Sequence, residues 1–144
     1  MKKSKRIKPV VDLAHHHERD AAKILGQALT EVNRHEQQLV QLKQYQDEYA
    51  ERFNAAGQVG ESISKLNDFL AFLTKIKGAV KAQEQAVEAA RSVLEEKKQF
   101  WFSKRGRSKA LDGVLDKYVK EERELVAKKE QKEQDDLRKP VSNH

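Results

Sequence analysis

The chain has 144 residues, with no cysteine, 6 glycines and 2 prolines, and 36% of its residues are charged. No disulfide, thiol nucleophile or cysteine-bound metal is therefore expected, and no apolar run approaches the ~20 residues of a membrane span. The start MKKSKRIK is not followed by the apolar stretch of a signal peptide. Because so few residues favour turns, we expect an all-α chain. The lack of a membrane span predicts a soluble chain, and the lack of cysteine allows it to function in a reducing compartment.

The formal net charge of +6 comes from two short basic segments. Residues 2–8 hold five cations, and residues 97–109 hold six with no acid among them. These eleven charges exceed the net charge, so the rest of the chain sums to −5. The basicity is therefore local, and the pI alone does not indicate nucleic-acid binding.

Two long segments carry apolar side chains at alternating spacings of four and three residues, on either side of AAGQVGES. The first predicts a helix from about 9 to 54, and the second a helix from about 62 to 136, with a loop at about 55–61. A period of 3.5 residues held this long predicts a left-handed coiled coil. The first stripe contains Ala21, Leu25, Ala28, Val32, His35, Leu39, Leu42, Gln46, Tyr49 and Phe53. The second contains Leu66, Phe69, Leu73, Ile76, Val80, Gln83, Val87, Ala90, Leu94, Lys97, Trp101, Lys104, Ser108, Leu111, Leu115, Tyr118, Glu122 and Leu125.

A short connection makes the two helices antiparallel neighbours, so the predicted fold is a single domain. It is a long antiparallel two-helix coiled-coil hairpin with a longer, overhanging C-terminal helix and disordered termini. Aligning the stripes from the loop outward pairs Tyr49 with Phe69 and Leu25 with Leu94, with numbers that sum to 118 or 119. Residue 10 then lies opposite about Lys109, and the second helix has no facing helix beyond it.

Three expectations follow from this alignment. His35 faces Gln83, and these two polar residues either pair across the seam or both lean into solvent. The two basic segments meet at the open end of the hairpin, beside Phe100, Trp101 and Phe102. An apolar strip on the overhang stays uncovered, as partner sites often are, and it consists of Leu111, Val114, Leu115, Tyr118 and Val119.

The sequence does not predict catalysis, a cofactor or a metal. A hairpin offers no enclosed pocket to tune a carboxylate or histidine, and neither a phosphate-binding loop nor a nucleophile motif is present. His15, His16 and His17 are consecutive, so on a helix they point ~100° apart and cannot chelate one ion from one face. We expect these three residues to form a solvated polar face.

A second row lies beside the seam near the predicted loop. Gln38, Leu42, Tyr45 and Tyr49 are spaced by four, three and four residues, and Phe72, Ile76, Ala79 and Gln83 repeat that spacing. The row is either the edge of a broad core or a docking surface for another protein. Tyr45 and Phe72 favour docking, because they belong to neither stripe.

At this point the chain resembles a known family. Four stretches are similar to the FliJ family of flagellar type III export proteins. They are AAKILG at 21–26, QQLVQLKQYQDEY at 37–49, FLAFL at 69–73 with Ala79 and Gln83, and EKKQ at 96–99. The resemblance implies a cytoplasmic, non-enzymatic stalk located at the flagellar base, peripheral to the inner membrane. It also implies insertion into the hexameric export ATPase FliI, promotion of ring assembly, coupling to the export gate protein FlhA, and binding of export chaperones.

The resemblance also implies site residues. The gate-binding positions match Gln38, Leu42, Tyr45, Tyr49, Phe72, Ile76, Ala79 and Gln83, of which Ile76 and Gln83 are the weakest matches. The segment SKRGRSK departs from the family pattern, so the ATPase contacts are assigned from the open end alone. They are Lys97, Lys98, Trp101, Lys104, Arg105, Arg107, Lys109, Leu111, Leu115 and Tyr118.

Three other functions remain open at this stage. A stalk of a virulence injectisome would share the architecture, and genomic neighbours would distinguish it. A nucleic-acid or anionic-membrane binder would use the basic cluster and Trp101, with binding that falls as salt rises. A self-assembling coiled coil would pair overhangs between copies, whereas the stalk is expected to be a monomer with neither nucleic-acid binding nor membrane insertion.

Overall fold

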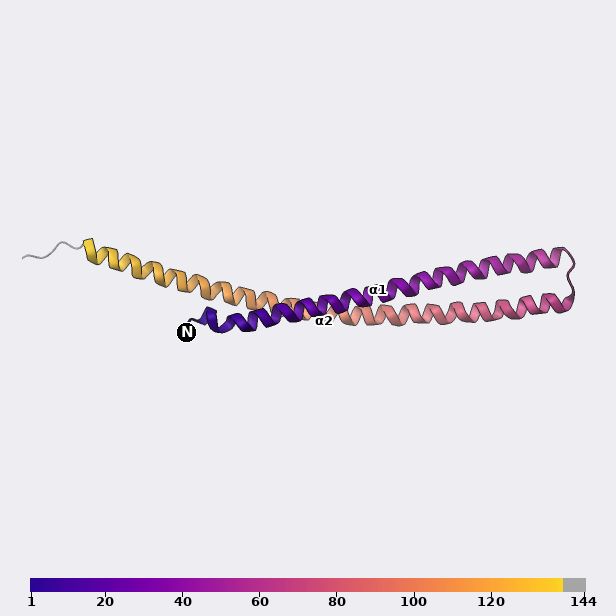
Figure 1. The fold of residues 1–144 in the computed structure, drawn as a ribbon, viewed down its shortest axis with the longest axis horizontal. Helices are drawn as coiled ribbons and strands as arrows, with labels where there is room; N and C mark the ends of the chain where they lie inside the picture. Colours follow the sequence, from indigo (N-terminus) through magenta and orange to yellow (C-terminus); the bar gives the residue numbers. More distant parts are fainter. Residues whose placement is uncertain (139–144) are drawn as a thin grey trace, which may run out of the picture. The chain divides into compact units, whose positions relative to one another are not determined.

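The computed structural model describes residues 1–138, which form helix α1 (Lys3–Gln58) and helix α2 (Ile63–Arg138), with no strand in that range. Contacts divide the chain into two units. The loop unit comprises residues 22–100, and the terminal unit comprises residues 1–21 together with those from 101 onward. In the loop unit, α1 and α2 lie side by side and antiparallel (Figure 1), which confirms the predicted all-α hairpin. Neither helix, as far as Arg138, contains a stretch apolar enough to cross a membrane.

Helix α1 begins six residues before the predicted boundary at residue 9, so the expectation of a disordered N-terminus was wrong for residues 3–8. The backbone N–H and the Oγ of Ser4 donate hydrogen bonds to the two carboxylate oxygens of Glu122, at 3.2 and 2.7 Å. The Nζ of Lys3 lies 5.5 Å from the centre of the Tyr118 ring. Pro9 lies inside the helix and is exposed. The missing N–H of this proline would by itself favour a boundary here, and the contacts to α2 hold the turns before it.

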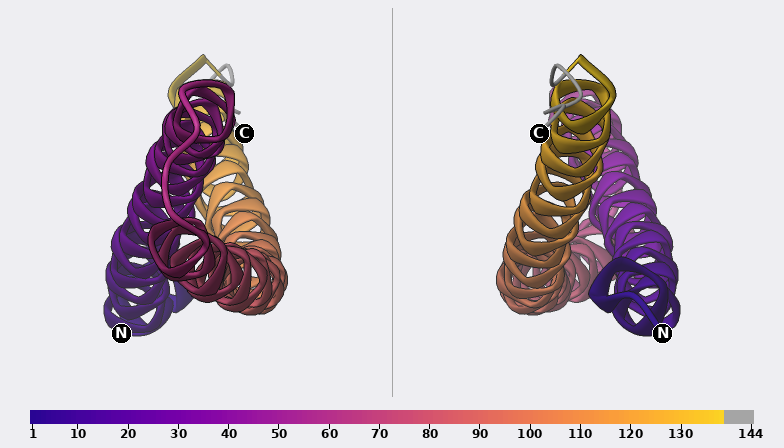
Figure 2. Two further views of the ribbon diagram at one scale, coloured as in Figure 1. Left: turned by 90° about the vertical axis from the view of Figure 1, so that its right-hand side faces the viewer. Right: turned by 90° about the vertical axis from the view of Figure 1, so that its left-hand side faces the viewer.

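The connection between the helices (Figure 2) is shorter than predicted. Its turn requires one glycine. Gly60 has φ of 75°, and its N–H bonds to the carbonyl of Gly57 at 3.3 Å. The N–H of Glu61 bonds to the carbonyl of Ala56 at 3.1 Å, which completes a Schellman motif. The Oγ of Ser62 accepts a hydrogen bond from the backbone N–H of Lys65 at 3.3 Å and caps α2. The break was expected to start at residue 55, but α1 continues through Gly57 because only Gly60 needs a positive φ.

The seam of the loop unit follows the predicted stripes. Every stripe residue from 25 to 53 and from 66 to 97 is buried or half-buried. The best-buried members are 3–8% exposed, and they are Ala28, Val32, Leu73, Ile76, Val80 and Val87. Burial of these side chains, at ~1.5–3 kcal/mol for each large aliphatic one, is the main force that holds the two helices together.

The terminal unit corrects the predicted alignment. Residue 15 was expected level with residue 104, yet His15 bonds to Ser108 and Asp112, one and two helical turns further along α2. A heptad pattern cannot exclude such a displacement, because a shift of seven residues leaves every stripe residue in the seam.

The overhang is therefore shorter than predicted. Helix α2 continues past the start of α1 (Figure 1), but residues 123–138 are the part that is exposed throughout. The strip predicted to be uncovered is mostly part of the seam, since Leu111, Leu115, Tyr118 and Val119 are half-buried, and Val114 is 36% exposed. The residues after Arg138, which were expected to be disordered, lie outside the described range.

Candidate partner-binding surfaces

Five aromatic rings gather in the loop unit near the connection between the helices. The ring centre of Tyr49 lies 5.3 Å from that of Phe69 and 4.7 Å from that of Phe72. Tyr45 meets Phe72 edge to face at 6.3 Å, and Phe53 meets Phe69 at 6.4 Å. Each such pair adds ~0.5–1.5 kcal/mol beyond its buried area. The cluster therefore fixes the orientation of the two rings that reach solvent, those of Tyr45 and Phe72, which are 42% and 38% exposed.

The eight predicted gate-binding residues do not all lie at the surface. Gln38, Tyr45, Phe72 and Ala79 are exposed, Leu42, Tyr49 and Gln83 are half-buried, and Ile76 is only 5% exposed. The structure thus brings four of the eight to an outer layer supported by the other four. Phe53 and Phe69, which the sequence placed only in the core stripes, belong to the same aromatic cluster.

Gln83 links the two helices beneath this surface. Its Nε2 donates to the backbone carbonyl of His35 at 2.9 Å, and lies 3.1 Å from His35 Nδ1 and 3.3 Å from Gln38 Oε1. Of the two alternatives that the sequence left open, His35 and Gln83 therefore pair across the seam and do not both lean into solvent. A pairing of this kind disfavours slipped alignments, in which each polar group would face an aliphatic side chain.

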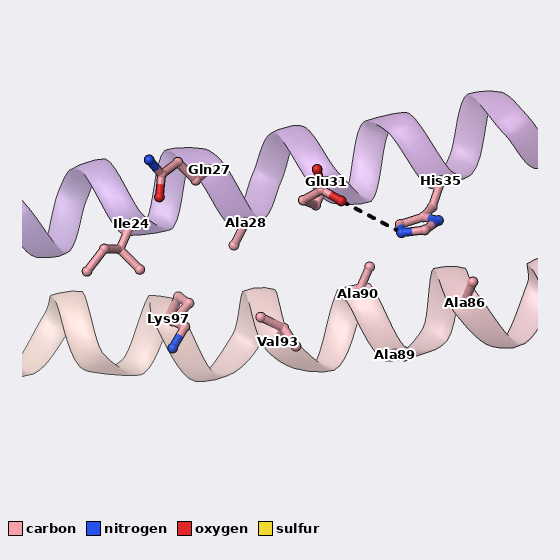
Figure 3. A pocket seen from close by; sticks show the side chains of 10 residues that line it. All are labelled: Ile24, Gln27, Ala28, Glu31, His35, Ala86, Ala89, Ala90, Val93 and Lys97. Carbon is pink, nitrogen blue, oxygen red and sulfur yellow. Dashed lines mark ion pairs between the residues drawn. The ribbon is translucent and has the colours of Figure 1, made fainter.

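Tyr45 and Phe72 each directly precede a seam residue in the sequence. Because their rings are in contact, the positions that precede seam residues, here called preceding positions, lie on one side of the loop unit. Figure 3 shows a groove lined by preceding positions of both helices: Ile24, Gln27 and Glu31 from α1, and Ala86, Ala89 and Val93 from α2. Its volume is about 490 Å³, and Ile24 and Val93 are 37% and 45% exposed. The sequence analysis missed this groove, although alanines at 79, 82, 86 and 89 spaced by three and four residues were a signal for it.

Glu31 forms the polar edge of the groove. Its carboxylate lies 2.8 Å from the guanidinium of Arg34. It also lies 3.8 Å from Nε2 of His35 (Figure 3). The hydrogen bond and the charge of Arg34 lower the pKa of the Glu31 carboxyl. The edge therefore carries a neutralised ion pair on an exposed helix, whose contribution to stability is small.

The ten predicted ATPase contacts separate into seam residues and surface residues. Lys98, Arg107 and Lys109 are exposed, whereas Lys97, Trp101, Lys104, Arg105, Leu111, Leu115 and Tyr118 are half-buried. The guanidinium of Arg105 lies 5.2 Å from the ring centre of Trp101, which also contacts Phe102 at 5.1 Å. Stacking of this kind keeps Trp101 partly covered.

His15 lies in a polar junction of the terminal unit and not on the solvated face predicted for the histidine run. Its Nδ1 is 3.1 Å from Ser108 Oγ, and its Nε2 is 2.7 Å from Asp112 Oδ1. The order of these groups matches a hydrolytic triad, but Ser108 is 1% exposed inside α2, where the backbone N–H groups are engaged in the helix and cannot bind an oxyanion. We therefore interpret the junction as a structural contact between the helices. No group of side chains in residues 1–138 has the geometry of a metal site.

Comparison of the sequence with known protein families gives one match. The family model described as "FliJ: Flagellar FliJ protein" matches residues 3–139, nearly the whole chain. Neither the curated proteins nor the solved structures contain a match. The matched span includes both helices, the aromatic cluster and the basic segments, and the chain belongs to the FliJ family of flagellar proteins.

Proposed function

We propose that this protein is a non-enzymatic adaptor of flagellar type III protein export. Its terminal unit binds the hexameric export ATPase FliI and promotes ring assembly, and its loop unit binds the export gate protein FlhA. The observation that carries the proposal is the exposed pair Tyr45 and Phe72, held rigid by the aromatic cluster. Large, preorganised aromatic side chains at a surface are the residues that most often dominate protein–protein affinity.

The outer layer of Gln38, Tyr45, Phe72 and Ala79 is the proposed contact with the gate. Ile76, Tyr49 and Leu42 would act from beneath by fixing the rings. The same proposal includes binding of export chaperones, a monomeric state, and a location in the cytoplasm at the flagellar base. Membership in the FliJ family supports each of these.

The gate contact is tested by the affinity of the purified protein for its cognate FlhA. Tyr45→Ala combined with Phe72→Ala should weaken binding by about tenfold or more, the effect of losing two central aromatic contacts. The matched control is Val40→Ala combined with Leu70→Ala. These side chains are 55% and 53% exposed, and each directly follows a seam residue, so both lie on the side of the helix pair opposite to Tyr45 and Phe72. Equal binding by the aromatic double variant and the wild type would refute this contact.

The ATPase contact is tested with the cognate ATPase. Addition of the full-length protein should raise both the oligomerisation of the ATPase, seen by sedimentation, and its rate of ATP hydrolysis. No change in either quantity at saturating protein would contradict the adaptor function.

A further inference from the structure

The terminal unit has two chemically different sides. The seam residues of this unit are buried or half-buried, and they are Ser4, Ile7, Val11, Ala14, Glu18, Ala21, Trp101, Lys104, Ser108, Leu111, Leu115, Tyr118 and Glu122. His15 directly follows Ala14, Asp112 directly follows Leu111, and the two side chains meet at 2.7 Å. The positions that directly precede the seam residues must therefore lie on the opposite side of this helix pair. Hydrogen bonds from Ser4 to Glu122 and between His15 and Ser108 bring residues 4–15 of α1 level with residues 108–122 of α2.

The side formed by these preceding positions combines cations with exposed apolar side chains. Val10, Leu13 and Val114 are 43%, 54% and 36% exposed, which is high for aliphatic residues near a seam. No carboxylate occupies a preceding position from residue 3 to 17 or from 103 to 117; the next ones are Asp20 and Glu121. We call this the basic-apolar face, and it consists of Lys3, Arg6, Val10, Leu13, His17, Ser103, Arg107, Ala110, Val114 and Lys117, all exposed.

The opposite side of the same helices is different. Its cations, such as Lys5, Lys8 and Lys109, alternate with the carboxylates of Asp12, Asp112 and Asp116. Its apolar residues are Val119, which is half-buried, and Phe102, which is 50% exposed and lies at the border with the loop unit. Mixed charges of this kind keep a helix solvated, whereas an apolar centre with charges of one sign around it is typical of a binding surface.

We propose that the basic-apolar face is the surface through which the terminal unit contacts the export ATPase, an assignment that rests on the proposed function. The surface it meets has an apolar centre bordered by carboxylates, because these groups complement Leu13 and Val10 in the middle and Arg6 and Arg107 toward the ends. The first turns of α1 therefore supply half of a contact that the sequence placed on α2 alone. Leu111, Leu115 and Tyr118 support it from the seam.

An anionic lipid surface would also attract these cations. However, the exposed apolar side chains of the face are short aliphatic ones, and it lacks the Trp, Tyr and Phe side chains that anchor helices in a headgroup layer. The composition of the face therefore favours a protein surface.

Two triple variants of the full-length protein separate the two sides. Lys3→Ala, Arg6→Ala and Arg107→Ala remove three cations from the basic-apolar face. Lys5→Ala, Lys8→Ala and Arg123→Ala remove three from the opposite side, again two from α1 and one from α2, and none of these three is a predicted ATPase contact. A further variant, Leu13→Gln, removes the most exposed aliphatic side chain of the face while keeping a good helix former. Circular dichroism confirms that each variant is helical before binding is measured.

Affinity for the immobilised cognate ATPase is then measured near physiological salt. The first triple variant and Leu13→Gln should each bind about tenfold more weakly than the wild type, and the control triple variant within about twofold of it. Equal weakening by both triple variants would reduce the effect to net charge and overturn the assignment. Wild-type affinity in the first triple variant would overturn it as well, while leaving the proposed function intact.

Two further outcomes separate the remaining possibilities. Vesicles of equal parts phosphatidylglycerol and phosphatidylcholine serve as the lipid probe. If the first triple variant loses vesicle binding but keeps ATPase binding, the face belongs to the membrane and the assignment is wrong. If the wild-type protein does not bind the ATPase at all, the ATPase half of the proposed function fails, and the assignment fails with it.

Discussion

Replacing Ile76 by alanine distinguishes a supporting residue from a contact residue. Ile76 belongs to the gate-binding set implied by the family, yet it is 5% exposed and lies in the seam of the loop unit. The substitution removes three carbon atoms, worth about 0.8 kcal/mol each when buried, and leaves a cavity that a two-helix pair can partly close. We expect the free energy of unfolding to fall by about 2–4 kcal/mol.

Urea denaturation followed by circular dichroism at 222 nm, the usual helix band, measures this loss. If the free energy of unfolding falls by about 2 kcal/mol per molar urea, the middle of the usual range, the midpoint should fall by roughly 1–2 M. Leu70→Ala is the matched control, because it removes the same number of carbon atoms from the same helix at a side chain that is 53% exposed. Its midpoint should move by no more than about a quarter of that shift.

The reasoning is refuted if Ile76→Ala keeps the wild-type midpoint but binds FlhA about tenfold more weakly. Ile76 would then act as a direct contact, and the burial of its side chain would not describe the protein in solution. If instead its stability falls and its FlhA binding at low temperature, where the variant is folded, stays within a few fold of the wild type, Ile76 is a supporting residue.

Three smaller changes test the helix ends and the contact between Ser4 and Glu122. Gly60→Ala should lower the free energy of unfolding by about 1–2 kcal/mol, because residue 60 has a positive φ. Gly57→Ala, inside α1, should raise the free energy of unfolding by up to about 1 kcal/mol. Equal effects of the two variants on the melting temperature would contradict the Schellman motif. Ser62→Ala should cost about 1 kcal/mol by removing the cap of α2, as seen by the same measurement. Hydrogen bonds from Ser4, with the charge of Lys2, lower the pKa of Glu122, so this contact is complete above the ordinary carboxyl pKa and is lost as pH falls through the lowered value. Glu122→Gln should therefore be less stable than the wild type at pH 7, and the difference should shrink as the pH falls through the lowered pKa. A difference in melting temperature that stays constant as the pH falls would show that the carboxylate is not involved.

The periodicity of the sequence predicted the seam of the loop unit well. All stripe residues from Leu25 to Phe53 and from Leu66 to Lys97 face the partner helix, and His35 meets Gln83. The reason is that a 3.5-residue repeat leaves only one side of each helix apolar, and a short connection permits only an antiparallel neighbour.

Other features had no distinct signal in the sequence. The start of α1 at Lys3 depends on contacts of its first turns with Glu122 and Tyr118, more than a hundred residues away, whereas the predicted helix began at about residue 9. The length of the overhang was overestimated for the same reason. The stripes placed Ile76 in the seam and Tyr45 outside it, as the structure does, whereas the gate-binding set implied by the family contains both residues. The resemblance therefore did not separate contact residues from supporting ones.

The four-residue connection also has a kinetic consequence. Tyr49 and Phe69 are twenty residues apart in sequence, whereas Ser4 and Glu122 are separated by 118. The entropy of closing a loop grows with its length, so contacts beside Gly60 form at the smallest cost and each heptad shortens the loop that the next must close. We expect the chain to zip from the aromatic cluster toward its two termini, and pulse-labelled hydrogen exchange during refolding would show protection of residues 40–75 before that of residues 4–15.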